Sequence, residues 1–353
     1  MKRLLSIAPL LVAIIAIQLL CAATGTLYYL TQMTMSAYYA LLIIGLCVLM
    51  GYAGQISLGH GGFFAIGGYI SAALTTHNLE PLQENVLVAA LNSLGLLHAG
   101  VDLYGGTFLV VTPWVACIVA ILAAVLISYL IGVPVLKLKG HYLAMATLGF
   151  GIIIYRVVLA SEYFGEADGI SGVPGFTLVP GLTVSGDFSG RIQNYYIAWG
   201  LLIIGLILLL NLIDSRVGRA LRAIHGSSEA ADAMGVNTAR FKIQTFVLSA
   251  VFAAIAGVFL THYNGGIGPS EASVMKSVRY VALVAVGGMA HLWGALTMGV
   301  LLNFLSLRGV FGSYDDAVFG LILILIMLFA PNGILSLRWR PGLAKQVDEK
   351  GDG

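Results

Sequence analysis

The sequence predicts an all-α fold, a polytopic transmembrane helical bundle of about 8 to 10 membrane segments, some of them glycine-rich broken or re-entrant helices. Of the 353 residues, 59% are hydrophobic and 10% are charged, whereas a soluble domain carries about 25% charged residues. The first uncharged run extends from Leu4 to Leu79, and a helix of about 20 residues already crosses a bilayer. A soluble fold is excluded because too few polar residues remain to face water.

Apolar segments and the residues that flank them set the expected helices. Lys2 and Arg3 before an apolar run also fit a signal peptide, but Leu19 and Leu20 stand before Cys21 in place of small residues, which favours an uncleaved helix. All three cysteines lie in apolar runs, so we expect free thiols. The nine expected helices cover residues 4–24, 33–50, 57–76, 112–136, 140–160, 195–213, 243–263, 280–304 and 315–332.

The distribution of Lys and Arg predicts the orientation. Basic residues gather at the N-terminus, at 137–139, in 216–242 and in the tail, and cytoplasmic loops collect such residues. Both termini are therefore predicted to be cytoplasmic. We expect one permease domain over residues 1–340, with an external loop at 161–194, a cytoplasmic coupling loop at 214–242 and a cytoplasmic tail at 341–353.

Two glycine-rich interruptions are candidates for the transport pathway. Nine simple crossings would leave the basic tail outside, so one segment cannot cross simply, and "VGGMAHLWG" (286–294) interrupts the 280–305 run. Irregular backbone inside a membrane is tolerated where protein or a water-filled cavity surrounds it. The second interruption is "GYAGQISLGHGGFFAIGGY" (51–69), which fits either tight helix packing or a pathway lining. The candidate pathway residues are Gln55, Ser57, His60, Gly287, Gly288 and His291.

The segment "RVGRALRAIHGSSEAADAMGVNTARFK" (216–242) predicts a short cytoplasmic helix over 228–235. Ser227 or Ser228 can cap its N-terminus, Glu229 suits its first turn and Gly235 suits its end. A face of Ala230, Ala231 and Ala233 would fit into a groove of a partner protein. The alternative is a solvated loop that follows the distribution of positive charge.

Missing motifs restrict the mechanism. The chain has no G-x-x-x-x-G-K-[ST] motif, so we expect it to bind no ATP or other cofactor itself and to rely on partner subunits for ATP. Every Asp and Glu falls in a predicted loop or at a helix end, which predicts a charge-free interior and disfavours proton coupling. No cluster of residues has the spacing of a metal or catalytic site. A sodium-coupled secondary carrier and a membrane enzyme are the less favoured alternatives, and the small net charge of +2 does not indicate nucleic-acid binding.

Several motifs in one order carry a family resemblance. "EAADAMG" (229–235) resembles the loop by which membrane subunits of bacterial ABC importers dock on their ATPases. Together with "GYAGQISLGHGGFFAIGGY", "DGISGVPG" (168–175) and "FAPNGIL" (329–335), it resembles the LivM/LivH permease family of branched-chain amino-acid importers. The resemblance runs from about residue 35 to residue 336 and is nearer to the LivM half in length and in its long external segment.

The resemblance implies a transport subunit of the bacterial inner membrane and not an enzyme. Its expected partners are a second permease, two cytoplasmic ATPases, an external solute-binding protein and membrane lipid. Branched-chain amino acids are the expected cargo, with urea or a short amide as the alternative. The chain departs from many relatives at 225–228 and at 166–168. The implied coupling residues are Arg219, Arg222, Glu229, Ala230, Ala231 and Gly235.

Overall fold

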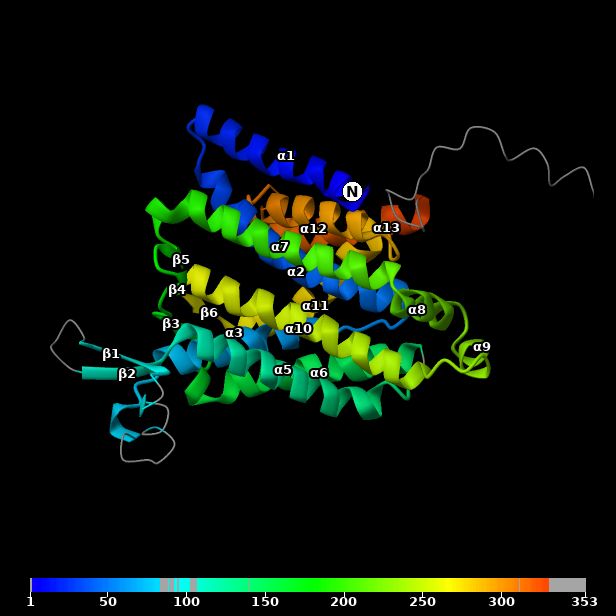
Figure 1. Ribbon diagram of the computed structural model, residues 1–353, viewed down its shortest axis with the longest axis horizontal. Coiled ribbons are helices and arrows are strands. Elements are labelled where there is room, and N and C mark those ends of the chain that lie inside the picture. The colour runs from blue at the N-terminus through cyan, green and yellow to red at the C-terminus, as the bar shows by residue number, and fades with distance from the viewer. Residues whose placement is uncertain are drawn as a thin grey trace, which may run out of the picture.

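Long helices that lie side by side form the body of the molecule (Figure 1). The computed structural model describes residues 2–82, 88, 92–93, 95–101, 107–138, 140–310 and 312–329. The short helices α8 (Arg216–Gly226) and α9 (Ser228–Ala233) lie at one end of the bundle, which we call the inner end. The strands lie at the opposite end, the outer end. The predicted tail at 341–353 and all of "FAPNGIL" except Phe329 lie outside the described residues.

All nine predicted helices are present, and the prediction of a polytopic helical bundle is confirmed. The segment expected at 280–304 is divided in two. Among the described residues, five spans are long and apolar enough to cross a membrane, namely Tyr28–Tyr52, Pro113–Val135, His141–Ala160, Phe188–Asp214 and Thr238–Asn264. The helices are α1 (Lys2–Ala23), α2 (Tyr28–Cys47, continued by a π-helical turn over Val48–Tyr52), α3 (His60–Thr76), α5 (Pro113–Val135), α6 (His141–Ala160), α7 (Arg191–Asp214), α10 (Thr238–Asn264), α11 (Val274–Gly287), α12 (Leu292–Leu307) and α13 (Asp315–Phe329).

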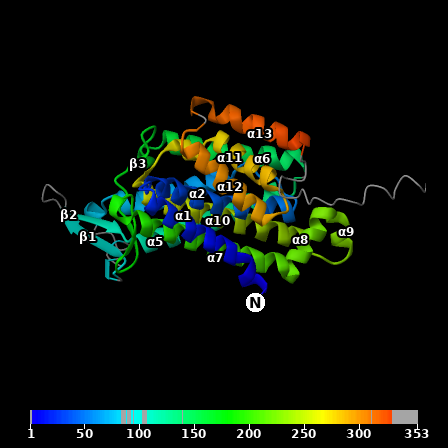
Figure 2. The same ribbon diagram turned by 90° about the horizontal axis from the view of Figure 1, so that it is seen from above.

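Helix α2 is the centre of the core, since most of its residues are buried and it packs against α7, α10 and α12. Figure 2 shows α13 along one flank of the bundle and α7 along the opposite flank. Helices α3 and α10 approach each other closely: a Cβ on Gly257 would lie 2.0 Å from the carbonyl oxygen of Phe64. A Cβ on Gly67 would lie 2.2 Å from the carbonyl oxygen of Ala254. These glycines therefore allow two backbones to meet, as small residues do in membrane helix pairs.

The two glycine-rich interruptions meet at the inner end. Residues 53–59 form no helix, and residues 288–291 join α11 to α12. The Tyr52 hydroxyl donates to the carbonyl oxygen of Ala290 at 2.8 Å, and the Cys47 thiol donates to that of Met289 at 3.4 Å. A Cβ on Gly51 would overlap the Met289 carbonyl. The predicted break in the 280–305 segment is confirmed, and the break closes a helical hairpin.

Short strands at the outer end were not predicted from the sequence. Strands β1 (Leu97–Val101) and β2 (Thr107–Val111) form an antiparallel pair between α3 and α5. The segment between α6 and α7 contributes β4 (Phe176–Val179), which pairs with β5 (Leu182–Val184). Strand β3 (Ile170–Ser171) pairs with β6 (Gly266–Ile267), which follows α10. Pairs this short leave little periodic signal in a sequence.

Candidate coupling site and pathway

The basic stretch ahead of the predicted coupling helix is itself a helix, α8. The Ser215 hydroxyl caps it by accepting the backbone N–H groups of Val217 at 3.1 Å and Gly218 at 3.4 Å. Leu221 and Ile224 are buried, whereas Arg219 and Arg222 are exposed. The arginines therefore occupy the solvent side of an amphipathic helix.

The predicted short helix is present as α9. Ser227, and not Ser228, is its N-cap, because the Ser227 hydroxyl accepts the N–H of Ala230 at 3.2 Å. The helix ends at Ala233, and Gly235 follows with φ +83°. This left-handed conformation suits glycine and ends the helix.

The exposed face of α9 differs from the predicted one. Ala231 is 4% exposed and packs into the core of its own chain, so the prediction of an open face formed by three alanines is wrong at this position. Ala230 and Ala233 are exposed beside Glu229. Met234 is 85% exposed, and sequence reasoning missed it, although an apolar side chain next to a polar helix was the available signal. We call Glu229, Ala230, Ala233 and Met234 the α9 face.

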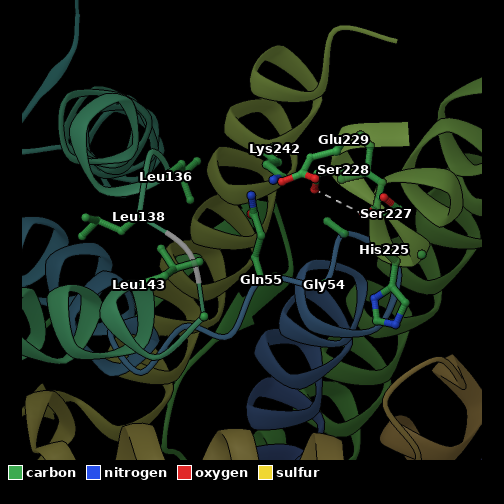
Figure 3. Close-up of a pocket in the computed structure, with 14 residues that line it drawn as sticks. Gly54, Gln55, Leu136, Leu138, Leu143, His225, Ser227, Ser228, Glu229 and Lys242 are labelled. Atoms are coloured by element: carbon green, nitrogen blue, oxygen red, sulfur yellow. Dashed lines mark hydrogen bonds between the residues drawn. The ribbon is translucent and has the colours of Figure 1, made fainter. Parts of the chain in front are cut away.

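A cavity of about 400 Å³ connects the coupling loop to the first glycine-rich break (Figure 3). Gln55 is 3% exposed, and neither atom of its side-chain amide has a hydrogen-bond partner among the described residues. In Figure 3 this side chain extends toward Lys242 and Glu229. The other lining residues include Gly54, Leu136, Leu138, Leu143, Ile224, His225, Ser227 and Ser228.

The coupling loop at 214–242 and the first glycine-rich break line the same cavity, and they also contact each other directly. Gly54 has φ +67°, and a Cβ on it would lie 3.0 Å from Nδ1 of His225 in α8. A displacement of α8 and α9 would therefore press on residues 53–55.

The other pathway candidates in this break lie in the core. His60 is buried; its Nδ1 lies 3.0 Å from the Ser57 hydroxyl and its Nε2 lies 2.7 Å from the Ser249 hydroxyl of α10. Both ring nitrogens thus have hydrogen-bond partners, which fits a packing role in this conformation. The pathway assignment of Gln55, Ser57 and His60 stays a prediction, and of the three Gln55 reaches a cavity described above.

The candidates in the second break lie at the turn of the α11–α12 hairpin. Gly287 packs against Gly294, since a Cβ on Gly287 would lie 2.5 Å from the backbone of Gly294. Gly288 has φ +99°, and His291 is exposed. Their pathway role also stays a prediction.

The expectation of a charge-free interior is wrong. The 3₁₀ turn at Pro269–Ala272 carries Glu271 to the Tyr39 hydroxyl of the central helix α2, where Glu271 also pairs with Lys276. Arg279 of α11 pairs with Asp315 of α13 at 2.8 Å. The sequence placed Glu271 in a loop correctly, but gave no sign that this loop enters the bundle.

The chain matches one protein family over most of its length. Residues 7–327 match the family described as "Branched-chain amino acid transport system / permease component". No solved structure matches the chain.

Individual relatives agree with the family. The permease LivM of Salmonella typhimurium, named as part of a high-affinity branched-chain amino acid transport system, is 30% identical over 341 residues, which is 90% of this chain and 72% of LivM. LivH of the same organism is 29% identical over 339 residues and is covered to 98% of its length. A ribose import permease of Haemophilus influenzae is 25% identical over 278 residues.

Proposed function

The chain belongs to the family of permease components of branched-chain amino acid transport systems, and on that premise we propose that it carries a branched-chain amino acid through a bacterial inner membrane. The family assignment makes it a permease subunit of an ABC importer and not an enzyme. We infer that it works with a second permease, two ATPases that bind ATP at the inner end, and a solute-binding protein at the outer end.

The α9 face is the observation that carries this proposal. Helix α9 projects from the inner end (Figure 1). Its α9 face combines exposed small side chains with Met234, which is 85% exposed. A short helix of this kind fits a groove in a partner. Ala231 of α9 packs into the hydrophobic core of the chain. A partner that moves α9 would therefore also move the core residues that contact Ala231.

The distribution of charge and the arrangement of the helix ends support the proposed orientation. Arg219 and Arg222 lie at the inner end with α8, and α1 begins toward the same end (Figure 1). Helix α13 runs back toward it. Since loops rich in Lys and Arg stay in the cytoplasm, this arrangement supports an inner end in the cytoplasm and both termini on that side.

The proposed mechanism is alternating access driven from the inner end. Movement of the ATPases would displace α9 and α8, and the contact of Gly54 with His225 would transmit the displacement to the break at 53–59. That break contacts the α11–α12 turn through its neighbours Gly51 and Tyr52. A transporter needs ligands that favour one of two arrangements, and ATP bound to the partners would supply that preference.

Reconstitution tests the proposal. The permease, its partner permease and ATPases would be placed in liposomes, and uptake of labelled leucine and labelled urea would be followed with the binding protein outside and ATP at the α9 side. We expect leucine uptake that requires both ATP and the binding protein. Urea uptake in place of leucine would overturn the cargo and keep the mechanism, whereas uptake driven by an ion gradient without partners would overturn the mechanism.

A further inference from the structure

A cluster of charged and hydroxyl groups lies inside the bundle, away from the coupling site. Lys276 Nζ lies 2.5 Å from a carboxylate oxygen of Glu271 and donates to the Tyr39 hydroxyl at 3.2 Å. The Tyr39 hydroxyl in turn donates to the Glu271 carboxylate at 3.2 Å. The Lys276 ammonium also lies 5.2 Å from the centre of the Tyr39 ring. We call these three residues the interior cluster.

The interior cluster lies near the middle of the membrane. Tyr39 belongs to the span Tyr28–Tyr52, and at 1.5 Å per residue it is about 16 Å from one end and about 20 Å from the other. The backbone N–H of Gly61, at the start of α3, donates to the Ser277 hydroxyl at 3.1 Å. Ser277 follows Lys276 directly in the first turn of α11. The start of α11 therefore lies beside the start of α3, inside the bundle.

The cluster is not sealed from its surroundings within this chain. The side chains of Lys276 and Glu271 are 29% and 17% exposed. Charged groups at this depth are costly against lipid and typically face a bundle interior or a water-filled cavity. We therefore expect the exposed edge of the cluster to face water or another protein surface and not hydrocarbon.

Two buried hydroxyls beside the cluster are an independent sign of a ligand. Tyr69 and Tyr280 are each 1% exposed, and neither hydroxyl has a hydrogen-bond partner among the described residues. Tyr69 packs in the same buried cluster as Ala272, the neighbour of Glu271, and the Tyr280 ring centre is 6.1 Å from that of Tyr39. Buried polar groups are nearly always satisfied, so these hydroxyls need a water or a ligand.

We propose that the interior cluster binds the charged groups of a zwitterionic amino acid on its way through the membrane, an inference that rests on the proposed cargo. The substrate ammonium contacts the Glu271 carboxylate, and the substrate carboxylate contacts the Lys276 ammonium. The empty site is neutral because Glu271 and Lys276 pair with each other. The occupied site is also neutral, because a zwitterion adds one charge of each sign in a region where unpaired charge is strongly disfavoured.

The second interior pair provides a contrast. Arg279 lies 2.8 Å from Asp315, donates to the Ser306 hydroxyl at 3.1 Å and lies 4.3 Å from the centre of the Phe319 ring. These partners belong to α12 and α13, so this pair holds three helices together. It serves as the matched control.

The test exchanges the charges of the interior cluster. The assembled importer with Glu271→Lys and Lys276→Glu together would be placed in liposomes, and labelled leucine uptake per assembled complex would be measured with ATP hydrolysis. The double variant keeps an ion pair, so it separates substrate binding from packing. We expect uptake to fall by about tenfold or more, equivalent to about 1.4 kcal/mol, while hydrolysis stimulated by the binding protein persists.

Further variants complete the test. Lys276→Arg keeps the charge and should retain most of the uptake, as should the control Arg279→Lys. Normal leucine uptake by the charge-exchanged variant would overturn the site and leave the proposed cargo intact. Absence of leucine uptake by the unmodified importer would overturn the cargo and this site together.

Discussion

Two histidines join helices α3 and α10, and they differ in what else they contact. His60 of α3 contacts the Ser249 hydroxyl of α10 at 2.7 Å, and His262 of α10 contacts the Ser71 hydroxyl of α3 at 2.8 Å. The second nitrogen of His60 lies 3.0 Å from Ser57 in the inner break. The second nitrogen of His262 donates to the carbonyl oxygen of Pro174 at 2.7 Å, in the outer segment.

One helix pair therefore holds both the inner break and the outer segment. The carbonyl oxygen of Pro174 can only accept, so Nδ1 of His262 carries a proton and donates it to this bond. The glycine contact between α3 and α10 lies between the two histidines. Changes to that contact should affect both ends, and changes to one histidine should affect one end.

The largest effect is expected from Gly257→Ala, which would disturb the shared contact. The new Cβ would lie 2.0 Å from the Phe64 carbonyl oxygen, and overpacking of this kind costs about 1–3 kcal/mol. Gly200→Ala in α7 is the matched control, since nothing lies within 4 Å of its Cβ. Thermal unfolding of the purified protein should show a lower midpoint for Gly257→Ala and not for Gly200→Ala. Equal midpoints would contradict the tight contact.

The next effect is expected from His60→Ala, which acts on the inner break. The change leaves the buried hydroxyls of Ser57 and Ser249 without this partner, at a cost of about 1–3 kcal/mol. Hydrogen exchange followed by mass spectrometry should rise over residues 53–59 and stay unchanged over 170–176. A rise at both ends would show that the two ends are not held separately.

His262→Ala should give the opposite pattern with a similar or smaller loss. The variant removes the contacts to Ser71 and to the Pro174 carbonyl, and a buried polar group left without its partner costs about 1–3 kcal/mol. Faster exchange is expected over 170–176, with 53–59 unaffected. Unchanged exchange over 170–176 would mean that the outer segment is held by its strand pairs alone.

The smallest effect is expected from Gly235→Ala, outside the helix pair. Gly235 has φ +83° and nothing lies within 4 Å of its Cβ, so the cost is backbone strain of about 1 kcal/mol. Uptake should fall modestly while the thermal midpoint changes little, because α9 lies at the surface. A large loss of thermal stability would show that α9 belongs to the folding core.

The sequence predicts what depends on neighbours along the chain. The cap of α9, its terminating glycine and the glycine density at 51–69 are local features, and each was assigned from the residue order. His60 drew attention because it stands in that glycine-rich stretch, whereas His262 stands in a regular apolar helix and gave no such signal.

What the sequence did not predict depends on contacts between distant segments. Ala231 is buried because α9 folds back on its own chain, and the alanine spacing alone does not define which side is covered. Glu271 comes after an apolar run, where a loop is expected. Its contact with the Tyr39 hydroxyl joins residues that are 232 positions apart in the sequence. The short outer strands pair by backbone, so their side chains carry little pattern.

Cross-linking at the α9 face tests the coupling claim most directly. Met234→Cys in the assembled importer would be treated with a short bismaleimide, with Val179→Cys, 60% exposed at the outer end, as the control. The native cysteines Cys21, Cys47 and Cys117 are buried. We expect Met234→Cys to join the permease to an ATPase subunit and the cross-link to stop ATP-driven uptake, with no such product from Val179→Cys. A fully labelled Met234→Cys that never reaches an ATPase and still supports normal uptake would contradict docking through α9.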